Sequence, residues 1–171
     1  YARFRPRYPQ SLFAELAALC ARRDQAWDCG TGNGQAAVAL AEYFERVIAT
    51  DASPQQIAEA ETHPKISYRA TDARRSGLDD ESTDLVTVAQ ALHWFESAAF
   101  FAEVRRVLRP GGRLLVVVGS LGELLAAPLQ SLAGPVKIHA GSAPDSHALL
   151  QAVRDACAAG AWPPVVGERL P

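Results

Sequence analysis

The sequence lacks several features that define particular classes of protein. It has no methionine, only three cysteines, no long apolar run and no block of like charge. Because its longest apolar runs are of strand length, we expect neither a membrane-spanning helix nor the apolar core of a signal peptide. Basic and acidic residues are interspersed and give a formal net charge of −2. This pattern does not favour binding to nucleic acid or to an anionic membrane.

The cysteines Cys20, Cys29 and Cys157 do not have the spacing of a disulfide framework or of a metal site. We therefore expect buried thiols, no bound metal and a location in the reducing cytoplasm. The chain begins at Tyr1, and methionine is absent throughout. These two features lead us to expect a fragment of a longer protein.

Apolar residues recur with two alternating periods along the first two thirds of the chain. The predicted helices are 10–23, 36–44, 54–62 and 96–108, and the predicted strands are 26–27, 46–50, 66–71, 84–90 and 114–118. Strands that alternate with helices at this spacing pair in parallel through right-handed crossovers. The sequence therefore predicts an α/β fold, a doubly wound and mostly parallel sheet with helices on both faces.

The regular pattern ends near residue 119, and six of the eleven prolines follow residue 120. We expect one domain, with a core at 1–119 and an irregular, partly helical segment at 120–171. Within that segment, helical patterns occur at 121–132 and 148–159, and short strand patterns at 136–138 and 165–166.

A glycine loop follows the first predicted strand and contains Gly30, Gly32 and Gly34. Such a loop brings backbone N–H groups and a helix N-terminus close to a bound nucleotide. A dinucleotide site needs the spacing G-x-G-x-x-G, and Gln35 stands where its last glycine would fall. The loop therefore predicts a nucleotide-type site but fits a dinucleotide poorly.

Three acidic residues at predicted strand ends describe the ligand further. Asp28 directly precedes the glycines, where a carboxylate suits an ammonium group and repels a pyrophosphate. Asp51 ends the second strand and can accept hydrogen bonds from both hydroxyls of a ribose. After the third strand, Asp72 can accept a hydrogen bond from an adenine amino group while Ala73 offers its backbone N–H. A solvated turn aspartate is the alternative for Asp72.

These segments, taken in order, resemble the motifs of the class I S-adenosylmethionine-dependent methyltransferases, and most closely their type 11 small-molecule branch. The resemblance covers residues 1 to about 119. The matching segments are 27–34, 48–53, 68–73, 84–94 and 108–112, together with 1–9, which is similar to the cofactor-covering segment of trans-aconitate methyltransferases.

The resemblance implies a Rossmann-like methyltransferase sheet, S-adenosylmethionine as cofactor, S-adenosylhomocysteine as product and a small-molecule acceptor. The implied cofactor-binding residues, from the methionine end to the covering segment, are Asp28, Gly30, Thr31, Gly32, Gln90, Asp51, Ala52, Asp72, Ala73, Tyr1 and Arg5. Complete members have two further strands that close the sheet with an antiparallel edge. We expect these C-terminal strands to be incomplete here.

The turn after the fourth predicted strand contains the candidate catalytic residue, His93. Methyl transfer is an in-line displacement at a carbon activated by its sulfonium, so the protein mainly aligns the nucleophile and excludes water. His93 lies where the methyl group should point and is the candidate general base. Packing beneath the cofactor is the alternative, and a carboxylate acceptor would need no base.

Three functions are compatible with these residues. The first is methyl transfer to a small molecule, and the second is a cofactor-binding module without activity, either truncated or degenerate. The third, a nicotinamide-dependent oxidoreductase, is disfavoured by the glycine spacing and by Asp28. Neither the acceptor nor the oligomeric state follows from the sequence.

Overall fold

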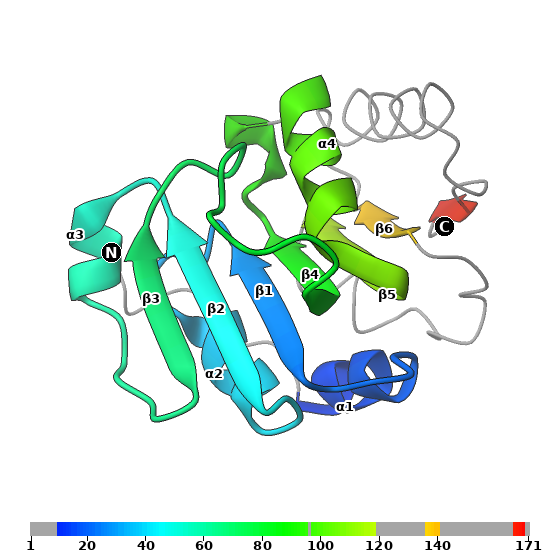
Figure 1. The fold of residues 1–171 in the computed structure, drawn as a ribbon, viewed down its shortest axis with the longest axis horizontal. Coiled ribbons are helices and arrows are strands. Elements are labelled where there is room, and N and C mark those ends of the chain that lie inside the picture. Colours follow the sequence, from blue (N-terminus) through cyan, green and yellow to red (C-terminus); the bar gives the residue numbers. More distant parts are fainter. Residues whose placement is uncertain (1–9, 96, 119–135, 141–165, 170–171) are drawn as a thin grey trace.

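The structure, a computed structural model, describes residues 10–95, 97–118, 136–140 and 166–169. Its strands form one sheet in the order β3-β2-β1-β4-β5-β6-β7, and every neighbouring pair is parallel. The strands are β1 (Gln25–Cys29), β2 (Arg46–Asp51), β3 (Ile66–Ala70), β4 (Thr83–Ala89), β5 (Leu108–Val118), β6 (Val136–Ala140) and β7 (Val166–Arg169). The direction of winding reverses between β1 and β4, at the centre of the sheet (Figure 1).

Helices cover both faces of this sheet (Figure 1). They are α1 (Gln10–Ala18), α2 (Gln35–Ala41), α3 (Pro54–Ala58), the 3₁₀ turn η2 (Leu92–Trp94) and α4 (Ala98–Val107). On one face, α1 and α2 pack against Ala26 and Leu85, and on the other α4 packs against Trp27 and Val86. Alternate residues of β1 and β4 thus pack into the cores on opposite faces of the sheet. The predicted doubly wound α/β fold is confirmed.

Local sequence explains where the helices begin. Pro54 occupies the first turn of α3, and the hydroxyl of Ser53 accepts a hydrogen bond from the backbone N–H of Gln56. In the same way, the Ser97 hydroxyl accepts a bond from the N–H of Phe100 at the start of α4. Such caps satisfy amides that have no partner within the helix.

The first helix ends earlier than its apolar pattern over 10–23 predicts. After α1, the amides of Leu19 and Cys20 bond to carbonyls three residues back, which tightens the last turn. The side chain of Arg23 donates to the Ala17 carbonyl at 3.1 Å. The Ala17 carbonyl thus accepts from both the Cys20 amide and a side chain from beyond the helix.

The fifth strand begins at Leu108, earlier than the predicted 114–118. Thr83 pairs with Leu108 and Leu85 with Arg113, so the intervening residues of β5 form a bulge. Gly111 lies within it at a φ of 79°, a value that favours glycine. The Pro-Gly-Gly turn after α4 is therefore absorbed into the strand.

At the amino ends of the central strands, the buried carboxylate of Asp84 joins β1, β4 and β5. It accepts the backbone N–H groups of Asp24 at 2.9 Å and of Gln25 at 3.0 Å, and it pairs with Arg109 at 2.7 Å. Asp84 is 4% exposed. This cluster lies at the edge of the sheet opposite the ends that carry the glycine loop.

The short strand patterns at 136–138 and 165–166 correspond to β6 and β7. Both pair in parallel, whereas the resemblance implies an antiparallel edge for complete members. The predicted helices at 121–132 and 148–159 lie outside the described residues. In the part of the chain that the structure describes, no helix is long and apolar enough to cross a membrane.

The core on the α4 face should depend strongly on Phe100. This side chain is fully buried, and its ring lies 4.9 Å from that of Phe95 and 5.2 Å from that of Phe101. We expect Phe100→Ala to lower the free energy of unfolding by about 3–5 kcal/mol, measured by urea titration. Ala102→Ser, at an exposed position of the same helix, should change it by less than about 0.5 kcal/mol. Equal losses in the two variants would contradict this packing.

Candidate functional site

A pocket of about 880 Å³ lies at the carboxyl ends of β1, β2, β3 and β4. Its lining comes from the four segments that follow these strands, within 28–36, 50–56, 71–74 and 89–95. Ligands of doubly wound proteins bind in this position, where the order of the strands reverses. The pocket therefore contains the glycine loop and the ends of three further strands.

The glycine loop wraps closely against its neighbours. Gly30 and Gly34 have φ values of 71° and 88°, which side chains rarely adopt. A Cβ at Gly30 would lie 2.5 Å from the Cβ of Ala91, and one at Gly34 would collide with the hydroxyl of Tyr68. Side chains at these positions would clash with Ala91 and Tyr68 and strain the backbone, so both glycines are needed for the loop's shape.

Asp28 lies beneath this loop and is 1% exposed. Its carboxylate accepts hydrogen bonds from the hydroxyls of Thr31 at 2.6 Å and of Thr87 at 2.7 Å, and one from the backbone of Ala37 in α2. Burial raises the pKa of Asp28, and these three donors oppose the rise. Asp28 forms part of the pocket lining and supports the loop from below. Its contact with a ligand's ammonium group stays a prediction.

Asp51 lies at the end of β2, between two of the loops that line the pocket. One carboxylate oxygen accepts the N–H of Gly32 and the other that of Ser53, both at 2.9 Å. Each oxygen can accept a further hydrogen bond, and the side chain is only half-buried. Asp51 therefore fits a ribose diol, and Ala52 is the next residue of the lining.

Asp72 lies in the pocket lining after β3, as predicted, but Arg74 binds its carboxylate. The guanidinium of Arg74 donates to the two oxygens at 2.8 and 2.6 Å, and the Arg74 backbone N–H donates at 2.8 Å. These bonds hold the pKa of Asp72 at about 2. Arg74 was not among the predicted site residues, although an arginine two residues after the aspartate could have indicated the pairing. An adenine amino group would share this carboxylate with Arg74.

The turn after β4 forms the remaining wall of the pocket. Gln90 is exposed and has a φ of 55°, a strained value that is more common at functional sites. Trp94 is 81% exposed, and the half-buried ring of Phe95 packs on Phe100 at 4.9 Å. Trp94 and Phe95 are thus the aromatic residues of this wall.

Some predicted residues cannot be placed in this pocket. The backbone of His93 belongs to η2, but its side chain lies outside the described part, as do Tyr1 and Arg5. Within the described residues, no group of three or more His, Cys, Asp or Glu side chains is arranged to hold a metal.

The fold and this pocket agree with the comparison to known families. A family model described as "Methyltransferase domain" matches residues 27–116, which is more than half of the chain. The chain therefore belongs to the methyltransferase domain family, and the resemblance to S-adenosylmethionine-dependent methyltransferases is confirmed.

Individual relatives show the same likeness. The chain is 43% identical over 117 residues to a proposed methyltransferase of Dictyostelium discoideum, covering 68% of this chain and 44% of the relative. It is 35% identical over 121 residues to a Saccharomyces cerevisiae protein provisionally assigned as S-adenosylmethionine-dependent, covering 66% and 42%. A solved structure of a proposed type II methyltransferase from Anaeromyxobacter dehalogenans matches with a TM-score of 0.63 and 48% identity, covering 65% and 47%. The chain spans less than half the length of these three relatives.

The bonds beneath the glycine loop lead to a pH-dependent prediction for Thr87. Thr87→Val removes a donor to the buried Asp28 carboxylate, so we expect a loss of about 1–3 kcal/mol in the free energy of unfolding at pH 7. Because burial raises the pKa of Asp28, the folded state holds its proton more tightly than the unfolded chain. The contribution of this tighter proton binding to folding stability is present at low pH and is lost as the pH rises through the folded pKa, where Asp28 becomes ionised.

The loss caused by Thr87→Val should therefore be smaller near pH 4, roughly the ordinary pKa of an aspartate, than at pH 7. Urea titrations at the two pH values measure the difference. Thr87→Ser, which keeps the hydroxyl, is the matched control and should retain most of the stability. A loss that is the same at both pH values would show that Thr87 does not act through the charge of Asp28.

Proposed function

We propose that this chain binds S-adenosylmethionine in the pocket and transfers its methyl group to a small-molecule acceptor. The observation that carries the proposal is the succession of polar groups along neighbouring strands. The glycine loop follows β1, Asp51 ends β2, and Asp72 follows β3. This order matches a ligand in which a ribose lies between an amino-acid end and an adenine end.

Each group has a role in binding. The loop residues Gly30, Thr31 and Gly32, with Asp28 beneath them, would lie against the amino-acid end. The ribose hydroxyls would donate to Asp51 beside Ala52. The remaining proposed contacts are Asp72 and Ala73 at the adenine, Gln90 near the sulfonium, and Tyr1 and Arg5 in the covering segment.

The bound cofactor supplies a methyl carbon already activated for displacement by its sulfonium. The protein's own task is then to align the acceptor and to exclude water. Trp94 and Phe95 form an apolar wall suited to excluding water beside Gln90. His93, in the same turn, is the proposed general base for acceptors that must lose a proton.

Further proposals follow from the composition and the sequence pattern. We propose that residues 1–119 form the cofactor-binding core and 120–171 a further part of the same domain. The described cysteines, Cys20 and Cys29, are buried free thiols, which supports a location in the cytoplasm. The mixed surface charge supports a small-molecule acceptor rather than nucleic acid or a membrane.

Cofactor binding can be tested by calorimetry with S-adenosylhomocysteine. We expect the chain to bind S-adenosylhomocysteine and not NAD, and Asp51→Ala to weaken binding by about 1–3 kcal/mol because the ribose loses its acceptor. Asp79→Ala removes an exposed carboxylate outside the pocket lining and should leave the affinity unchanged. Binding of NAD, or an unchanged affinity in Asp51→Ala, would contradict the proposal.

Catalysis can be tested separately with acceptors that carry hydroxyl, amine or carboxylate groups. With hydroxyl and amine acceptors, we expect His93→Asn to lower the turnover rate roughly 10²- to 10⁴-fold, while the affinity for S-adenosylhomocysteine stays the same. With carboxylates, which are already ionised at neutral pH, the rate should not change. Cofactor binding without turnover of any acceptor would favour the inactive cofactor-binding module.

A further inference from the structure

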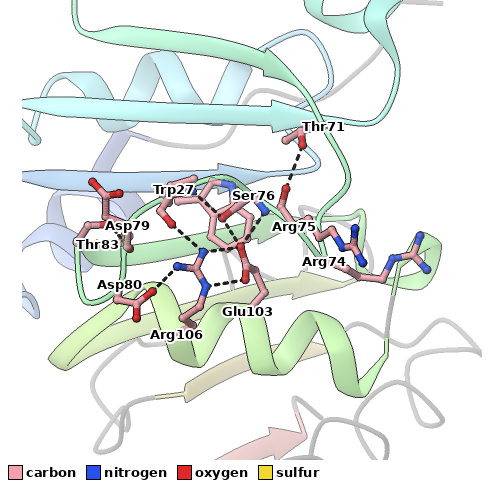
Figure 2. A network of polar contacts seen from close by, with 12 residues as sticks. Trp27, Thr71, Arg74, Arg75, Ser76, Asp79, Asp80, Thr83, Glu103 and Arg106 are labelled. Carbon is pink, nitrogen blue, oxygen red and sulfur yellow. Dashed lines mark hydrogen bonds and ion pairs between the residues drawn. The ribbon is translucent and has the colours of Figure 1, made fainter.

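A buried carboxylate outside the pocket ties the loop between β3 and β4 to helix α4. Glu103, in the middle of α4, is 9% exposed. Its Oε1 accepts hydrogen bonds from the backbone N–H of Ser76 at 2.8 Å and from the Ser76 hydroxyl at 2.6 Å. Figure 2 shows these bonds reaching from the helix to the loop. Two donors of one loop residue are thus satisfied by one side chain of the helix.

Arg106, one turn further along α4, fixes a second point of the same loop. Its guanidinium donates to Glu103 at 2.9 and 2.8 Å and to the Leu78 carbonyl at 2.7 Å, and it pairs with Asp80 (Figure 2). Ser76 and Leu78 are 2% and 6% exposed. Glu103 and Arg106 therefore hold the loop where it is buried against the helix.

The opposite end of this loop lines the cofactor pocket. Asp72, Ala73 and Arg74 belong to the pocket lining, and Ala73 packs in the same core cluster as Leu78. The hydroxyl of Thr71 donates to the Arg75 carbonyl at 3.1 Å, which closes the turn between the pocket and Ser76 (Figure 2). The short, internally bonded turn connects the residues proposed for the adenine to the point held by Glu103.

We propose that Glu103 is a positioning residue for the adenine end of the cofactor pocket. Glu103 holds Ser76 in place, and the position of Ser76 sets the placement of Asp72 and Ala73. Glu103 does not contact the ligand itself. The inference rests on the proposed binding of S-adenosylmethionine in this pocket. The bonds from Arg106 and Ser76 also lower the pKa of Glu103 to about 2, so the carboxylate is ionised and able to accept these bonds at neutral pH.

The test compares Glu103→Gln with a matched variant, Asp84→Asn. Both residues are buried carboxylates that accept backbone N–H groups and pair with an arginine, but Asp84 lies at the opposite edge of the sheet. We expect both variants to lower Tm. Only Glu103→Gln should weaken the binding of S-adenosylhomocysteine, by roughly 3- to 30-fold, in calorimetry at a temperature where both are folded.

A second ligand separates positioning from a loss of stability. S-inosylhomocysteine has an oxo group in place of the adenine amino group, so the preference for S-adenosylhomocysteine over it reports on the contact with Asp72. This preference should fall in Glu103→Gln and stay unchanged in Asp84→Asn. If Glu103→Gln does not fold, Ser76→Ala decides by the same two measurements; it removes the hydroxyl bond to Glu103 and the bond that this hydroxyl accepts from the Leu78 N–H, and keeps the Ser76 N–H bond to Glu103.

Unchanged affinity and preference in the folded variant, or equal losses in Asp84→Asn, would overturn the role of Glu103. Failure of the unmodified chain to bind S-adenosylhomocysteine would instead overturn the proposed function. The two failures are therefore distinguishable.

Discussion

The site depends on one buried carboxylate, Asp28, beneath the glycine loop. It is the last residue but one of the central strand β1, and its hydrogen bonds join the loop through Thr31, the neighbouring strand β4 through Thr87, and α2 through Ala37. The start of α2 has no side-chain cap of its own, because Gly34 stands at that position. Asp28 thus supplies the acceptor that the glycine lacks, and burial of its charge is tolerated because donors surround it.

The remaining polar groups of the pocket take their positions from the parallel sheet. Adjacent strands point the same way, so the residues that follow them meet at one edge. Asp51 bonds to the loop at Gly32, and Asp72 lies one strand further out. The order of the strands therefore converts three separate stretches of sequence into a continuous row of acceptors.

Helix α4 contacts two segments of the pocket lining, the turn after β4 and the loop after β3. At its start, Phe100 packs on Phe95 of the aromatic wall, and near its middle Glu103 holds the loop that carries Asp72. A rigid helix in contact with both segments fixes their separation, which would suit the alignment of a cofactor and an acceptor that we propose for this pocket. The Asp84 cluster joins the amino ends of β1, β4 and β5. The loops that line the pocket lie at the opposite edge of the sheet.

The sequence by itself determined the elements of the core and the candidate residues after each strand, because these features are local. Periodic apolar residues define helices and strands, Gly30 and Gly34 belong to the loop after the first predicted strand, and Asp51 ends the second. Only the tertiary structure decided which side chains support them. Thr87 under Asp28, Glu103 on Ser76 and the length of α1 depend on contacts between distant segments or on side-chain reach. No periodicity along the chain encodes such contacts, since they arise when the sheet brings separate elements together.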